Sequence, residues 1–66
     1  MTANEEFIVT DVTLRSLVRL LKNQGYNLDS IKAQYDAEIL DNVLSGAAPQ
    51  YKHKSIALLD EVIKEA

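Results

Sequence analysis

The stretch that decides the fold spans residues 11–28 and reads DVTLRSLVRLLKNQGYNL. At the 100° per residue of an α-helix, one arc collects four apolar side chains: Leu14, Leu17, Val18 and Leu21. The opposite arc collects the basic side chains: Arg15, Arg19 and Lys22. This separation is typical of an amphipathic helix. Asp11 or Thr13 is suited to cap its start and Gly25 to end it, so the sequence predicts a helix over about residues 12–24.

The residues after Gly25 show a second helix start followed by a second apolar stripe. Asn27 is a favourable N-cap, and Asp29 falls in the first turn, where a carboxylate suits the helix dipole. The stripe consists of Leu28, Ile31, Tyr35, Ile39 and Val43, widened by Leu40 and Leu44. These features predict a helix over about residues 28–45 that ends at Gly46.

Asp36 falls close to this apolar stripe, which is awkward for one straight and buried helix. The alternative is a break near Tyr35, with Asp36 capping a second short helix and Tyr35 packed against Leu40. The continuous helix is the favoured reading of the two.

Residues 46–50 are turn-like and contain Pro49, and a third amphipathic helix is predicted over about residues 51–65. Its apolar arc holds Tyr51, Leu58, Leu59, Val62 and Ile63, with Ile56 at the edge. The fold class predicted from the sequence is therefore all-α, a small three-helix bundle in one domain, residues 1–66. Its expected core is Leu14, Leu17, Val18, Leu21, Ile31, Tyr35, Ile39, Val43, Leu58, Leu59, Val62 and Ile63.

The first ten residues are harder to assign. Phe7, Ile8 and Val9 are apolar and β-prone, but the run is too short to show a period. We expect a short extended arm over residues 1–10, or a strand, that packs on the helices.

The length of the chain predicts an oligomer. A domain of 66 residues buries only about 60% of its unfolded surface, so its stability is marginal. Small folds are usually stabilised by disulfides, a metal or a second chain. The chain has no cysteine and one histidine, His53, which leaves a second chain, and we expect a homodimer.

Charge and hydropathy disfavour several classes of partner. The net charge of −3 and the pI of about 4.9 disfavour non-specific attraction to nucleic acid or to an anionic membrane. No apolar run approaches the ~20 residues of a membrane span, and residues 1–6 lack the features of a secretory signal. The absence of cysteine fits a reducing compartment, so a cytoplasmic location is expected.

The sequence contains no motif for catalysis, a cofactor or a metal. His53 has no evident orienting group or nucleophile, and the basic cluster Lys52, His53 and Lys54 is interpreted as surface charge. The carboxylates at residues 29–41 have no calcium-loop spacing. We therefore expect a protein that is not an enzyme and binds no cofactor or metal.

The apolar arcs are wider than a small core needs, which indicates a protein interface. The surplus residues are Val12, Leu20, Leu40 and Leu44, and the basic row of Arg15, Arg19 and Lys22 would form a charged rim that selects the partner. The expected function is that of a small non-enzymatic interaction protein that regulates or assembles a larger protein partner, with Leu20, Leu40, Leu44 and the basic row in contact.

Two partial resemblances favour an alternative function. The stretch from Asp11 to Ile31 is similar to the second half of MerR-type DNA-binding domains, although no room precedes it for their helix-turn-helix. Residues 7–11 with the two following helices resemble the ribbon-helix-helix of small dimeric repressors and antitoxins, whose strands enter the major groove. Glu5, Glu6 and Asp11 beside that strand would repel phosphates. The resemblances imply a dimeric DNA-binding regulator or an antitoxin-like protein.

Overall fold

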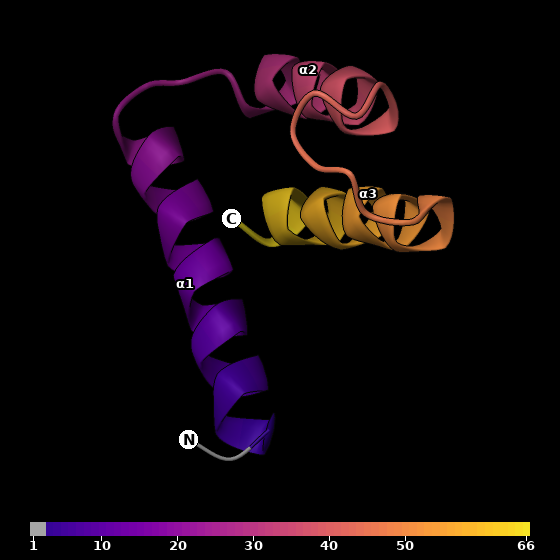
Figure 1. The fold of residues 1–66 in the computed structure, drawn as a ribbon. Helices are drawn as coiled ribbons and strands as arrows, with labels where there is room; N and C mark the ends of the chain where they lie inside the picture. Colours follow the sequence, from indigo (N-terminus) through magenta and orange to yellow (C-terminus); the bar gives the residue numbers. More distant parts are fainter. Residues whose placement is uncertain (1–2) are drawn as a thin grey trace.

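The computed structural model describes residues 3–66, and this part of the chain forms three α-helices and no strand. They are α1 (Ala3–Asn23), α2 (Leu28–Leu40) and α3 (Pro49–Glu65). Helices α2 and α3 lie side by side and run antiparallel, and α1 crosses the end of this pair (Figure 1). The predicted all-α fold with three helices is confirmed.

Helix α1 begins much earlier than predicted. Residues 3–10 are helical where an extended arm was expected, and residues 1 and 2 of that arm lie outside the described residues. Glu5 and Glu6 fall in the first turn, where carboxylates interact favourably with the helix dipole. The β-preference of Phe7, Ile8 and Val9 depends on packing in a sheet, which the described residues do not form, so it does not interrupt the helix.

Helix α1 ends as the sequence predicts, at Gly25. The glycine adopts a φ of 88°, its N–H donates to the Lys22 carbonyl at 3.0 Å, and the Tyr26 N–H donates to the Leu21 carbonyl at 3.1 Å. This pair of hydrogen bonds is the Schellman motif, which satisfies carbonyls at the end of a helix.

Helix α2 starts at the predicted cap and is unbroken. The Asn27 side chain accepts a hydrogen bond from the Ser30 N–H at 3.1 Å. The helix continues through Tyr35 and Asp36, so the alternative of a break is not found. Asp36 is accommodated by an ion pair with Lys32, one turn earlier on the same helix.

Helix α2 ends at Leu40, and its predicted continuation to residue 45 is wrong. Asn42 adopts a φ of 62° and donates its N–H to the Ile39 carbonyl at 3.3 Å, while the Val43 N–H donates to the Glu38 carbonyl at 2.9 Å. These bonds repeat the Schellman pattern with asparagine in place of glycine. Asparagine is the next most tolerant residue for this left-handed conformation, so Asn42 ends the helix before Gly46 is reached.

Helix α3 starts at Pro49, two residues before the predicted start. Proline suits the first position of a helix because its fixed φ is helical and its missing N–H would have no partner there.

The core is smaller than predicted. Its central cluster is Val18, Leu59 and Val62, and Ile39 is buried on α2. The partly buried side chains packed on the cluster include Leu14, Leu28, Tyr35 and Ile63. Three expected core residues are exposed: Leu17 by 52%, Val43 by 65% and Leu58 by 43%. Val43 follows the end of α2, Leu17 lines an open apolar groove between the helices, and Leu58 is exposed on α3.

Lys52 is buried, contrary to its interpretation as surface charge. Only 5% of the residue is exposed, and its ammonium group donates a hydrogen bond to the side-chain oxygen of Asn42. The other two members of the cluster, His53 and Lys54, are exposed. The Asn42–Lys52 contact joins the turn after α2 to the first turn of α3.

Candidate interaction surface

An apolar groove lies between the three helices, with a volume of about 170 Å³. Leu14, Leu17 and Leu21 line it from α1, Leu28 and Ile31 from α2, and Ile63 from α3. Catalytic pockets combine apolar walls with a few convergent polar groups. The walls of this groove come from aliphatic side chains and Tyr35, so it is suited to apolar contact rather than to a reaction.

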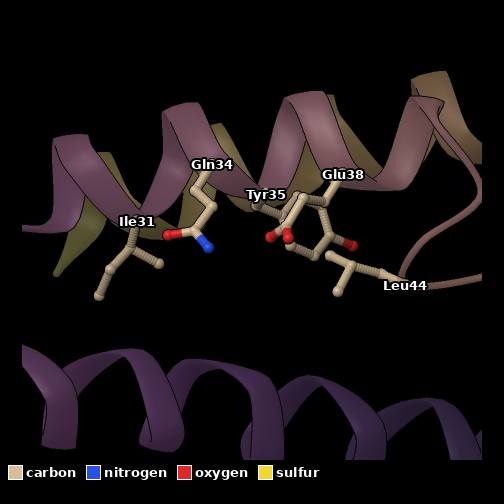
Figure 2. Close-up of a pocket in the computed structure, with 5 residues that line it drawn as sticks. All are labelled: Ile31, Gln34, Tyr35, Glu38 and Leu44. Carbon is tan, nitrogen blue, oxygen red and sulfur yellow. The ribbon is translucent and has the colours of Figure 1, made fainter.

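A second hollow, of about 180 Å³, follows one side of α2 (Figure 2). Ile31, Gln34, Tyr35 and Glu38 line it from the helix, and Leu44 closes it from the turn that follows. The Tyr35 hydroxyl lies 2.5 Å from the Ser55 hydroxyl on α3, which fixes the tyrosine at the back of the hollow. The hollow therefore presents apolar surface with one amide and one carboxylate at its rim.

The three predicted apolar contact residues, Leu20, Leu40 and Leu44, are all about half-exposed. Leu20 lies on α1, whereas Leu40 and Leu44 lie at the end of α2 that is farther from the α1–α2 connection (Figure 1). The structure thus places these side chains on two surfaces rather than one.

Arg15, the first residue of the predicted basic row, faces α3. Its Nε donates to the Asp11 carboxylate at 3.0 Å, and its Nη1 donates to the Glu65 carboxylate. These hydrogen bonds, above all the one that Arg15 donates to Asp11, raise the pKa of the Arg15 guanidinium above its ordinary value. Arg15 therefore joins α1 to the last turn of α3.

Lys22 lies about two turns after Arg15 on α1 and makes a similar contact. Its ammonium group donates a hydrogen bond to the Ala66 carbonyl at 2.6 Å. Arg19 is exposed, and its side chain has no hydrogen-bond or ion-pair partner among residues 3–66. Of the predicted row, Arg19 is the member with its charge available to a partner, and the binding role of all three stays a prediction.

Polar contacts between α2 and α3 are the features that sequence reasoning missed. Tyr35 pairs with Ser55 and Asn42 with Lys52, and both pairs depend on the way the two helices align. Asn42 was the one available signal, because asparagine is common at helix ends. Asp36 has a buried Oδ1 without a hydrogen-bond partner in the described part of the chain, which is a local cost of placing a carboxylate beside the core.

Residues 3–66 contain neither a metal-binding cluster nor a membrane-spanning helix. No group of three or more histidine, aspartate or glutamate side chains there is arranged to hold a metal ion. None of the helices described is both long enough and apolar enough to cross a membrane.

Comparison with known proteins gives no relative. No family model matches the sequence, no curated protein is significantly similar to it, and no solved structure significantly matches its fold.

Proposed function

We propose that this chain is a small, non-enzymatic interaction protein that regulates or assembles a larger protein partner. The observation that carries the proposal is the exposure of its large apolar side chains. Twelve of them are at least 43% exposed in a chain of 66 residues. Large exposed apolar patches are rare on soluble monomers and mark interfaces.

The contact with the larger partner is assigned to the end of α2. Leu40 and Leu44 are exposed there, and Leu44 borders the hollow along Ile31 and Tyr35. An apolar side chain of the partner would fill the hollow, with Gln34 and Glu38 at the rim to select its orientation.

The proposal also includes self-association to a homodimer and a cytoplasmic location. The size argument supports the dimer, because a core centred on four buried apolar residues leaves a single chain marginally stable. The sequence without cysteine supports a reducing compartment.

DNA binding is the alternative function that the experiment must distinguish from protein binding. Its basis is weakened by three observations: residues 7–11 are helical, Arg15 and Lys22 contact α3, and the net charge is −3. A complex held by phosphates dissociates steeply as salt rises, whereas an apolar protein contact responds little.

The test is affinity capture from cell extract with the immobilised full chain at increasing salt concentration. We expect a captured protein that persists as salt rises. The double variant Leu40→Glu, Leu44→Glu should lose it, whereas the control Tyr51→Glu, at an exposed site on α3, should retain it. Capture of nucleic acid alone, or a captured protein that both variants retain equally, would contradict the proposal.

A further inference from the structure

The first half of α1 projects beyond the rest of the molecule (Figure 1). Its apolar side chains Phe7, Ile8, Val9 and Val12 are all about half-exposed or more. We propose that a second copy of this chain packs antiparallel along α1 and covers the face that carries Ile8, Val12 and Leu20. The inference rests on the self-association included in the proposed function and assigns its surface and geometry.

The face is defined by helical spacing. At 100° per residue, an arc of about 120° on α1, which starts about 80° from the buried Val18, contains Ile8, Val9, Val12 and Leu20. Its polar members are Glu5, Ser16, Arg19 and Asn23. Because Val18 points into the core, this arc points away from α2 and α3 and is open along the whole length of α1.

The surface of the single chain is larger than a folded monomer of its mass should have. Its accessible area is 4917 Å², whereas about 4,200 Å² is expected for a 7.4 kDa monomer. The radius of gyration is 12.6 Å, against about 11 Å for a compact domain of this length. The excess of roughly 700 Å² is close to the ~800 Å² that each partner contributes to a standard interface.

The first half of α1 also lacks the packing that normally maintains a helix. All residues from 3 to 13 are exposed. Isolated helices shorter than about 12–15 residues are marginal in water, and most helical stability in proteins comes from a packed apolar face. A second helix along this segment would supply that packing.

The charges on α1 select the second copy and its direction. The first half of α1 is acidic, with Glu5, Glu6 and Asp11, and the second half is basic, with Arg15, Arg19 and Lys22, although Asp11 and Arg15 pair with each other and Arg15 and Lys22 also contact the end of α3. Two such helices placed antiparallel bring opposite charges together, and placed parallel they bring like charges together. Antiparallel packing centred near Val12 would bring the acidic end of α1 in one copy beside Arg19 of the other. It closes with two-fold symmetry, the commonest symmetry of homodimers.

The first experiment measures the dimer dissociation constant by sedimentation equilibrium. The double variant Ile8→Glu, Val12→Glu places two charges in the face and should raise the constant at least about tenfold. Both positions are exposed in the single chain, so the core is unaffected, and circular dichroism should still show a helical protein. The matched control Val43→Glu, at an equally exposed site after α2, should dimerise like the unchanged chain. A monomeric unchanged chain, or equal constants for the two variants, would overturn the proposal.

The second experiment tests direction. Since the chain has no cysteine, single cysteines at Asn23 and Thr13 can carry spin labels without competing sites. In the antiparallel dimer the labels at residue 23 lie about 30 Å apart by the helical rise, and those at residue 13 lie near the ~10 Å separation of packed helices. Short distances at residue 23 would indicate parallel helices, and long distances at residue 13 a dimer formed elsewhere. Either result overturns the proposal.

The two proposals fail separately. If the dimer is absent but the Leu40 and Leu44 surface still captures a protein, the α1 pairing alone is wrong. If the antiparallel dimer forms and no protein is captured, the larger partner alone is wrong.

Discussion

Asn42 has two tasks at the junction of α2 and α3. Its left-handed backbone ends α2, and its side-chain oxygen accepts the hydrogen bond of the buried Lys52 ammonium group. A buried ammonium group without an acceptor is costly, so one residue determines both where the helix stops and whether Lys52 is tolerated beside the core.

Substitutions at Asn42 should separate these two tasks. Asn42→Gly keeps the left-handed conformation but removes the acceptor, and should cost about 2 kcal/mol, the range for hydrogen bonds to charged groups. Asn42→Ala also introduces backbone strain, and should cost roughly 1 kcal/mol more. Urea unfolding of the two variants measures both values. Equal stability of the glycine and alanine variants would show that the backbone conformation carries no strain.

Leu58 and Leu59 are neighbours on α3 with opposite environments, 43% and 8% exposed. Leu59→Ala should therefore reduce the free energy of unfolding by about 2–5 kcal/mol, as for other buried leucines. Leu58→Ala serves as the matched control and should cost less than about 1 kcal/mol. Denaturant titration of both variants is the measurement, and similar losses would place Leu58 in the core as its helical arc had suggested.

At the level of elements, local sequence signals predicted the three helices well, but they predicted less well how far α1 and α2 extend. Asn27 and Gly25 act at helix ends because their own conformations and hydrogen bonds suffice. The early end of α2 was missed because Asn42 is a weaker stop than glycine. The helical state of residues 3–10 was missed because a β-prone run is ambiguous at this length.

The last turns of α3 contain an ion pair that responds to acid. Lys64 lies 2.8 Å from the Asp60 carboxylate, and its hydrogen bond lowers the pKa of Asp60 below the ordinary 3.8. Because the pKa of Asp60 is lowered in the folded state, the ion pair contributes fully to stability above pH 3.8. This contribution is lost as the pH falls through the pKa of Asp60 in the folded protein.

NMR titration of the Asp60 carboxyl carbon should therefore give a midpoint below 3.8. Lys64→Gln should raise that midpoint toward the ordinary value, because the charged donor is gone. The control Lys54→Gln, on the first turns of the same helix, should leave it unchanged. An Asp60 midpoint that Lys64→Gln does not move would show that the pair is not formed in solution.

At the scale of the whole molecule, the sequence predicted the exposure of the candidate apolar residues but not the contacts of the basic ones. Leu20, Leu40 and Leu44 are exposed, as wide apolar arcs imply. The basic row was harder to interpret, because helical spacing gives a common face but not what lies opposite that face. Arg15 and Lys22 meet the end of α3, a contact made across more than 40 residues of chain.

This small domain exposes apolar surface, and we propose that a second protein chain covers it. The most direct test is the mass of the unchanged protein in solution, measured by sedimentation equilibrium over a wide range of concentration. We predict a mass of twice the 7.4 kDa chain that falls toward the single-chain value on dilution. A mass of one chain at every concentration, with the helices intact, would contradict the claim.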